Sequence, residues 1–253
     1  MPTQAGNSQP SPPTPPVRAA GVALFLDIDG VLAPIAATPE GVGPDPRRTA
    51  VLERLARKLD GRLAILSGRT LAEIDRIAGT PLAAAAGVHG LERRQDGRTL
   101  RVAADPALGD AVQAFRDFAR DRPGARVEDK GLATALHYRL APDHAHAALD
   151  LARDLADASG LSLQRGDMVV ELRTPGADKG AALTAFMQSP PFAGAVPVML
   201  GDDLTDEDAF RAAAALGGYG VLVGPARETA ATRRLADQGQ VLDWLEAVAE
   251  ADG

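Results

Sequence analysis

Two aspartates near the start of the sequence have the spacing expected of a site that binds a cation or a phosphate. Asp27 and Asp29 directly follow the apolar run Val22–Leu26, in the segment LFLDIDGVLAPI. Side chains two residues apart in an extended segment point the same way, so the two carboxylates would crowd each other unless a cation lay between them. The alternative is a plain strand that ends in an Asp-Gly turn at Gly30, since this pair is common in turns.

A second acidic cluster, GDDLTDEDAF, follows another apolar run, Val196–Leu200. Three of its acids fit a structural role at the positive end of a helix that Thr205 would cap. They are Asp206, Glu207 and Asp208. Asp202 and Asp203 precede this predicted cap and are the better metal candidates. Because the cluster offers carboxylates and few nitrogens, it indicates a hard cation, and Mg²⁺ suits phosphate chemistry.

Two further segments could bind an anion. ILSGRT places Ser67, Gly68 and Arg69 beside a predicted helix start, where backbone N–H groups receive phosphates well. An ordinary strand-to-helix turn capped by Thr70 explains the same residues. Lys179, in ADKGAAL, also stands at a predicted helix start, where a cation is unfavourable with the helix dipole. A lysine placed against that preference indicates an anionic ligand, unless its side chain reaches out to solvent.

Apolar runs alternate with helical patterns on both sides of the middle of the chain, which predicts a parallel sheet covered by helices on both faces. The predicted strands are Val22–Leu26, Leu63–Leu66, Leu82–Ala86, Val196–Leu200 and Gly220–Val223. The predicted helices are Arg47–Leu59, Thr70–Ala78, Lys179–Met187, Thr205–Leu216 and Val241–Ala249. Polar clusters follow four of these strands, the third of them being His89 and Gly90. Ligands bind at the carboxyl ends of parallel strands, so we expect the clusters to meet at one edge.

The middle of the chain has a different pattern. Helices are predicted at Ala111–Ala119 and His144–Ala158, and strands at Leu132–Tyr138, Leu161–Gln164 and Met168–Leu172. We interpret residues 105–174 as an inserted α+β unit, with 19–104 and 175–253 forming the parallel α/β domain. Residues 1–18 are rich in Pro, Ser and Gln and are expected to form a disordered or extended tail.

Composition narrows the class of protein. The chain has 253 residues and a net charge of −7, and this acidic balance argues against a nucleic-acid partner. It has no cysteine, which excludes disulfides, thiolate metal sites and cysteine nucleophiles. No apolar run approaches the ~20 residues of a membrane span, and the start lacks the order of a signal peptide. We therefore expect a cytoplasmic protein with no membrane partner. A monomer is also expected, although the sequence itself does not reveal the oligomeric state.

The segments DIDG, ILSGR, ADKG and LGDD, in this order, resemble the haloacid dehalogenase superfamily of phosphohydrolases over roughly residues 21–104 and 175–253. PIAATP, AAGVHGLE, VEDKGLATALHYR and VVELRTPGADKG are similar to the trehalose-6-phosphate phosphatase family within it. The resemblance implies a Rossmann-like α/β core with a mobile α/β cap, which falls on the inserted unit. It also implies Mg²⁺-dependent hydrolysis of trehalose 6-phosphate, in trehalose biosynthesis, through a phospho-aspartyl intermediate.

The resemblance further implies a role for individual residues. Asp27 would be the nucleophile and Asp29 the general acid/base. Asp27, the backbone carbonyl of Asp29, and Asp202 would hold Mg²⁺, while Ser67 and Lys179 would hold the phosphoryl group. The sugar would meet Arg69, His89, Gly90 and Glu92 from the core, and Glu128, Lys130 and Glu171 from the cap. Asp203 and Asp206 are candidates for support behind the metal ligands, and the sequence leaves open whether either touches the ion.

One departure and several alternatives accompany this interpretation. Val31 stands where the superfamily usually has Thr, so we expect weaker support of the loop but retained activity. Without the resemblance, Glu128 and Lys130 would be read as a solvated charged turn. His137, His144 and His146 show no ligand spacing and are expected to be structural or solvated. Alternative functions are a phosphatase for sucrose phosphate or another sugar phosphate, a phosphomutase, and a catalytically silent binding module.

Overall fold

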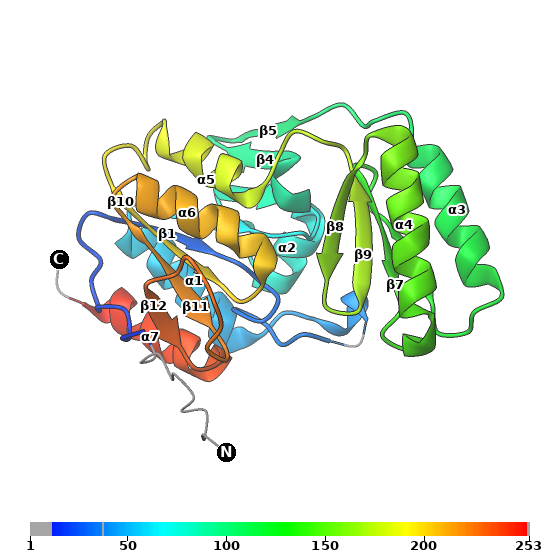
Figure 1. Cartoon of the computed structure of the whole chain (residues 1–253). Helices are drawn as coiled ribbons and strands as arrows, with labels where there is room; N and C mark the ends of the chain where they lie inside the picture. The colour runs from blue at the N-terminus through cyan, green and yellow to red at the C-terminus, as the bar shows by residue number, and fades with distance from the viewer. Residues whose placement is uncertain (1–11, 37, 252–253) are drawn as a thin grey trace, which may run out of the picture.

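The computed structural model describes residues 12–36 and 38–251, which form two sheets side by side (Figure 1). The larger sheet has eight strands in the order β12-β11-β10-β1-β2-β3-β4-β5. Their bounds are β1 Val22–Leu26, β2 Leu63–Leu66, β3 Ala84–Gly87, β4 Glu92–Gln95, β5 Arg98–Arg101, β10 Val196–Gly201, β11 Tyr219–Val223 and β12 Arg233–Leu235. The run from β12 to β3 is parallel, and β4 and β5 extend it as an antiparallel hairpin.

Helices cover both faces of this sheet, as predicted. They are α1 Pro46–Lys58, α2 Leu71–Ala78, α5 Lys179–Met187, α6 Glu207–Ala215 and α7 Gln238–Glu250. In β1, Leu24 and Leu26 pack with α1, α2 and α7, whereas Ala23 and Phe25 pack with α5 and α6. Since both faces of the strand are buried, its sequence is apolar throughout. Phe25 also stacks on Phe192, with the ring centroids 5.4 Å apart.

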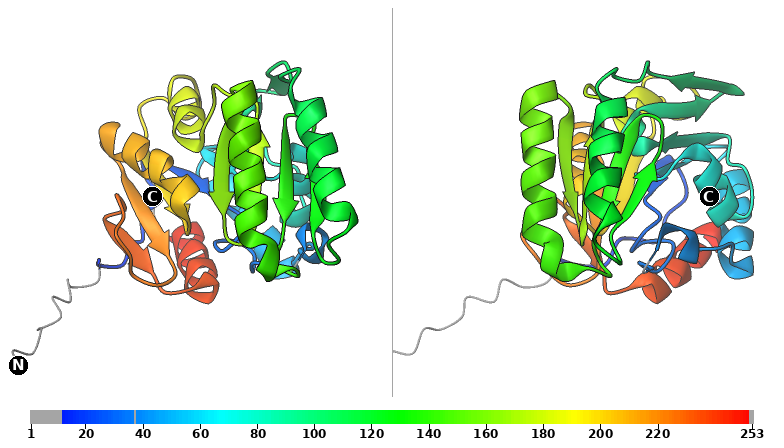
Figure 2. Two further views of the ribbon diagram at one scale, coloured as in Figure 1. Left: turned by 45° about the vertical axis from the view of Figure 1, so that its right-hand side comes forward. Right: turned by 90° about the vertical axis from the view of Figure 1, so that its right-hand side faces the viewer.

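The smaller sheet and two helices form the unit that we name the cap. It comprises α3 Leu108–Arg120, β6 Arg126–Asp129, β7 Ala133–His137, α4 Ala145–Ser159, β8 Ser162–Gly166 and β9 Val169–Arg173. Its antiparallel strands run in the order β6-β7-β9-β8. Both helices lie on the face turned away from the core (Figure 1, Figure 2). In β9, Val170 and Leu172 pack under these helices, which leaves Val169 and Glu171 on the face toward the core.

The structure confirms the predicted α/β class with an added α+β unit, and four strands are additional findings. β4 and β5 are polar, and β5 is exposed along its whole length, so no apolar run marks them. Their turn at Asp96 and Gly97, both with positive φ, is the Asp-Gly pair typical of tight hairpins. β6 (RVED) and β12 (RRL) are short and mostly charged, so no apolar run marks them either.

The region after β10 also differs from the prediction. Thr205 does not cap the helix; Asp203 caps the 3₁₀ turn η4 (Leu204–Asp206), and Thr205 donates its backbone N–H and its hydroxyl to Asp203 Oδ1. α6 therefore begins at Glu207, two residues later than expected. An aspartate accepts such a bond in the extended conformation that Asp203 adopts, which makes it the better cap.

Part of the proline-rich tail, residues 1–11, lies outside the described residues. Residues 12–18 form neither helix nor strand but lie against the edge of the large sheet, where the carbonyl of Pro13 accepts the N–H of Arg234 at 3.0 Å. Pro15 is buried there. Among the described residues, no helix is both long enough and apolar enough to cross a membrane.

Candidate active site

A cavity of about 250 Å³ lies between the carboxyl ends of the core strands and the open face of the cap sheet. From the core it is lined by Asp27, Asp29, Ser67, Gly68, Arg69, His89, Lys179, Asp202, Asp203 and Thr205, and from the loop after β1 by Ile35, Ala36 and Thr38. From the cap it is lined by Glu128, Lys130, Ala135, His137, Arg139, Gln164, Gly166, Asp167, Val169 and Glu171. The four predicted polar clusters therefore meet at one edge of the sheet.

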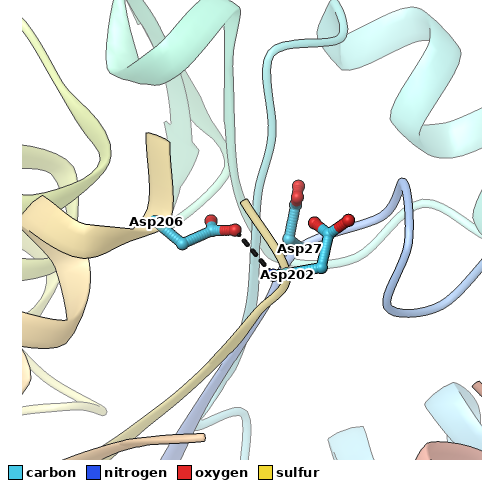
Figure 3. A group of neighbouring side chains, drawn as sticks. All are labelled: Asp27, Asp202 and Asp206. Carbon is cyan, nitrogen blue, oxygen red and sulfur yellow. Dashed lines mark hydrogen bonds between the residues drawn. The ribbon is translucent and has the colours of Figure 1, made fainter. Parts of the chain in front are cut away.

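Three aspartates form a compact group of carboxylates at this cavity, and two of them, Asp27 and Asp202, line its wall. One oxygen each of Asp27, Asp202 and Asp206 lies within 4.8 Å of the others (Figure 3). Burial, together with the negative charge of the neighbouring carboxylates, raises the pKa of Asp202 to about 7. The same causes, opposed by Lys179, raise the pKa of Asp27. These raised pKa values reflect both burial and the repulsion between the ionised carboxylates. Mg²⁺ fits such a group, because it prefers oxygen ligands and its positive charge would offset the repulsion between the carboxylates.

The Asp206 carboxylate accepts three hydrogen bonds. Its Oδ1 accepts from Lys179 Nζ at 2.7 Å, and its Oδ2 accepts the N–H groups of Asp202 and Asp203 at 2.9 and 3.2 Å. The bond to Asp202 is the dashed line in Figure 3. Asp206 is fully buried and does not line the cavity. Its geometry suits support of the loop, whereas Asp27 and Asp202 face the cavity.

Lys179 is the first residue of α5, where Asp178 caps the helix by accepting the N–H of Ala181. Its side chain is only 2% exposed, and Nζ lies 3.1 Å from Asp27 Oδ2. With Asp206 on its other side, it is paired with two carboxylates rather than reaching out to solvent. Burial alone would lower the pKa of Lys179, but these negative charges raise it, so the ammonium keeps its proton.

The ILSGRT segment combines both interpretations offered for it. Thr70 does cap α2, in a capping box with Glu73. At the same time Ser67 is buried, with its Oγ accepting the N–H of Arg69 at 3.2 Å. Gly68 lines the cavity next to His89, and a Cβ there would lie 2.6 Å from His89 Nε2. The close approach of the His89 ring therefore requires glycine at this position.

Arg69 and Asp29 form a two-pronged ion pair. The guanidinium donates from Nε to Oδ2 and from Nη2 to Oδ1 of Asp29, both at 2.8 Å. Arg69 is buried, and Glu73 lies 3.5 Å away on the other side. Paired donors of this kind hold a carboxylate in one direction and favour its ionised form. The orientation of Asp29 is therefore set by the strand next to its own.

In the cap, Lys130 is the centre of a buried charged group. Its Nζ donates to Glu171 Oε2 at 2.5 Å and to the backbone carbonyl of Gly68 at 2.9 Å. Glu171 Oε1 lies 3.4 Å from His89 Nε2. Burial acts to raise the pKa of Glu171, but the charge of Lys130 and the contact with His89 outweigh it and lower the pKa. These contacts join the cap to the core at Gly68 and His89, next to the predicted phosphate ligand Ser67.

Glu128 and His137 complete this group. Glu128 lies on β6 rather than in a solvated turn, and its Oε2 is 2.8 Å from His137 Nε2. His137 lines the cavity and pairs with Glu128, a contact that was not expected from the sequence. A single histidine in a strand has no spacing pattern that would mark it. The register of β6 against β7 places His137 close to Glu128 in the wall of the cavity.

The trehalose-phosphatase family model matches residues 25–238 of this chain. The chain belongs to the trehalose-phosphatase family. It is 41% identical over 239 residues to trehalose-6-phosphate phosphatase of Escherichia coli, covering 93% of this chain and 90% of that protein. It is also 41% identical over 210 residues to a probable trehalose-phosphate phosphatase of Sinorhizobium fredii, covering 80% and 78%.

Solved structures agree with this trehalose-phosphatase assignment. A trehalose-6-phosphate phosphatase related protein aligns with a TM-score of 0.78 and 28% identity, over 90% of this chain and 97% of that one. The C-terminal domain of the Candida albicans trehalose-6-phosphate phosphatase has a TM-score of 0.80 over 93% of each chain, and at 24% identity it supports the fold alone. The resemblance found in the sequence is thereby confirmed, and with it the prediction of a phosphatase.

Two of the residues expected to meet the sugar do not line the cavity. Glu92 Oε1 accepts the backbone N–H of Leu71 at 2.6 Å and so holds the start of α2. Gly90 has a φ of +99° and packs against the start of α5, where a Cβ would lie 3.0 Å from the carbonyl oxygen of Asp178. Glu92 and Gly90 therefore support the starts of α2 and α5, which lie next to the cavity.

The cavity also includes residues that no sequence motif had marked. Arg139 donates to the Oδ2 of Asp167 at 2.8 Å, and Gln164 lies nearby on β8. Val31, the departure from the superfamily pattern, is fully buried in the apolar core beside α1 and α2. Its side chain contributes to packing, and the loop is held by backbone bonds such as Gly30 N–H to the carbonyl of Ala33 at 2.8 Å.

Proposed function

We propose that this protein hydrolyses trehalose 6-phosphate to trehalose and phosphate, with Mg²⁺ and through a phospho-aspartyl intermediate on Asp27. The observation that carries the proposal is the position of Asp27. Its carboxylate lies beside Lys179 and Asp202, at the base of a cavity whose opposite wall is the charged group of the cap. A nucleophile, a phosphate-binding cation and a hydroxyl-binding wall thus share one enclosed space.

Asp27, Asp202 and the backbone carbonyl of Asp29 would hold Mg²⁺, which when bound supplies positive charge that offsets the repulsion between a carboxylate and a phosphate. Asp27 attacks phosphorus and forms a P–O bond to its carboxylate, while the bond from phosphorus to the sugar oxygen breaks. Lys179 and Ser67 hold the phosphoryl oxygens during this transfer. Asp206 supports the loop of Asp202 and keeps Lys179 in place.

Asp29 donates a proton to the departing sugar oxygen. It then accepts a proton from the water that attacks phosphorus, so that phosphate is released and Asp27 is regenerated. Through its two bonds, Arg69 sets the direction of the Asp29 carboxylate in the wall of the same cavity. One residue that serves as acid and then as base is sufficient for a hydrolase.

We propose that residues 105–174 act as a cap that selects the sugar. Glu128, Lys130 and Glu171 offer charged donors and acceptors to hydroxyl groups, and Arg69 and His89 face them from the core. A site that pairs with hydroxyl groups rejects analogues lacking them, because its own buried polar groups would then be left unpaired. Closure over the substrate also excludes water from the reacting groups.

The proposal includes the partners expected from the sequence: a small sugar phosphate, and neither nucleic acid nor a membrane. It also includes a monomer acting in the cytoplasm. The net charge of −7 supports the exclusion of nucleic acid. Light scattering of the purified protein tests the monomer, and a second copy in the particle would contradict it.

The deciding experiment is phosphate release with Mg²⁺ from trehalose 6-phosphate, glucose 6-phosphate and sucrose 6-phosphate, with and without EDTA. We expect a strong preference for trehalose 6-phosphate and loss of activity in EDTA. Preference for another sugar phosphate would retain the core chemistry and contradict the assignment of the cap. Turnover that requires a bisphosphate activator and releases little phosphate would instead indicate a phosphomutase.

A further inference from the structure

The loop after β11, residues 224–232, lies against the segment that carries Asp202. From this loop, the guanidinium of Arg227 donates from Nη2 to the carbonyl oxygen of Asp203 at 2.7 Å and lies 3.4 Å from that of Asp202. Neither the sequence motifs nor the proposed mechanism uses Arg227. By these contacts, Arg227 binds the backbone of the segment that carries the predicted metal ligand Asp202.

Glu207, on the first turn of α6, fixes Arg227 and the loop that carries it. Its Oε1 accepts from Arg227 Nη1 at 2.5 Å and from the hydroxyl of Thr229 at 2.8 Å. Its Oε2 accepts the N–H of Ala230 at 2.8 Å. The Glu207 side chain is only 11% exposed, so these bonds are well shielded from water. Arg227 is thus held from behind rather than projecting freely into solvent.

The segment of Asp202 and Asp203 is consequently held from two sides. Its N–H groups donate inward to the buried carboxylate of Asp206, and its carbonyl groups accept outward from Arg227. In the peptide unit between Asp202 and Asp203, the N–H of Asp203 donates to Asp206 and the carbonyl oxygen of Asp202 lies 3.4 Å from Arg227. Opposite charges therefore contact the two ends of one peptide dipole and oppose its rotation. The direction of the Asp202 carboxylate depends on that backbone.

We propose that Arg227 is a positioning residue for the metal site, acting through the backbone of Asp202 and Asp203 to keep the Asp202 carboxylate aimed at the cation. The inference rests on the proposed Mg²⁺-dependent function. Groups that orient metal ligands without touching the metal typically change metal affinity by about 10- to 100-fold when removed. A purely structural role of Arg227 would alter stability without a selective change in metal affinity.

The test is direct metal binding by the full chain without substrate. Mn²⁺ serves as the probe, followed by electron paramagnetic resonance, with Mg²⁺ in competition. We expect Arg227→Met to weaken Mn²⁺ binding about 10-fold or more, and Arg227→Lys to recover part of it, since lysine keeps a donor but not the planar fork. The metal concentration for half-maximal activity should rise in parallel, while kcat at saturating Mg²⁺ stays close to wild type.

Arg211→Met is the matched control, because Arg211 lies on α6 and pairs with Asp208 at the surface. It should bind Mn²⁺ like the wild type. Folding is checked by circular dichroism of the metal-free proteins, and Arg227→Lys carries the test if Arg227→Met does not fold. Unchanged Mn²⁺ affinity in a folded Arg227 variant would overturn the inference while leaving the proposed function intact. Absence of Mn²⁺ and Mg²⁺ binding by the wild type would overturn both.

Discussion

Gly30 and the carboxylate of Asp202 adjoin so closely that a Cβ on Gly30 would lie 1.9 Å from Asp202 Oδ2. Gly30 also has a φ of +77°, in the region that favours glycine. The glycine of the first motif therefore has two functions: it allows the turn after Asp29, and it leaves the space in which a carboxylate from another strand lies. The need for glycine at position 30 therefore links the loop after β1, which carries Asp29, to the loop after β10, which carries Asp202.

We predict that Gly30→Ala weakens Mg²⁺ binding and lowers turnover by about 10-fold or more, because Asp202 must move aside. Gly21→Ala is the matched control: Gly21 has a φ of +68°, and nothing lies within 4 Å of its Cβ position. It should lose about 1 kcal/mol of stability from backbone strain alone and keep its metal affinity. Equal Mg²⁺ affinity in the two variants, measured by calorimetry, would contradict the prediction.

Asp27→Asn should abolish turnover without unfolding the protein. Turnover should fall by about 10⁴-fold or more, as expected when a covalent nucleophile is removed. The variant should melt at or above the wild-type temperature in the absence of metal, because burial and the nearby carboxylates make the charge of Asp27 unfavourable. Phosphate release and a thermal melt check both parts. Wild-type phosphate release by a folded variant would exclude Asp27 as the nucleophile.

Lys130→Met should affect the sugar and spare the phosphate chemistry. Loss of a charged donor that faces sugar hydroxyl groups should raise KM for trehalose 6-phosphate about 10- to 100-fold. Hydrolysis of p-nitrophenyl phosphate, which has no sugar, should stay close to wild type. Lys58→Met, at the end of α1 and away from the cavity, is the control. If both substrates are affected equally, Lys130 acts on the reaction centre rather than on specificity.

The pairing of Glu171 with Lys130 predicts a pH-dependent stability. Burial acts to raise the pKa of Glu171, but Lys130 and His89 lower it below its ordinary value of 4.5. The ionised carboxylate therefore stabilises the fold above about pH 4.5, and this contribution is lost as the pH falls toward the lower folded pKa. Burial acts to lower the pKa of Lys130, but Glu171 and Glu128 raise it above its ordinary value of 10.5. The stabilisation by this pair is therefore fully present up to about pH 10.5 and is lost only as the pH rises through the higher folded pKa.

Glu171→Gln should remove this dependence. At about pH 7 the variant should be less stable than the wild type by about 3 kcal/mol, because Lys130 loses its buried partner. Urea unfolding from about pH 7 to about pH 3.5 measures the difference between the two proteins, which should shrink below about pH 4.5. A difference that stays constant over this range would show that ionisation of Glu171 contributes nothing to folding.

The sequence was most informative where chain segments are buried on both faces. β2 and α5 begin and end at the residues predicted, because Leu63–Leu66 is enclosed by helices and Lys179–Met187 is bounded by a clear cap. The polar hairpin of β4 and β5 was not predicted, since exposed edge strands carry little apolar pattern. Its Asp96-Gly97 turn was the signal available.

At the site, the residue types were predictable and their partners were not. The aspartates of two motifs and Lys179 were selected from their places after strands and before helices. The pairing of Arg69 with Asp29 joins neighbouring strands and cannot be read from local spacing. The contacts of His137 and Arg227 were missed for the same reason, since only the tertiary structure brings their partners close to them.

The strand order of the core has a consequence for how the protein is made. β1 lies between β2 and β10, and residues 22–26 pair with residues 196–200. The whole cap, with a sheet and an apolar core of its own, is synthesised in between. On the ribosome, the cap can therefore fold while β1 still lacks one neighbour, and long-range parallel pairing of this kind forms slowly. The nascent chain should be inactive, and most exposed to aggregation, until β10 emerges and completes both the sheet and the site.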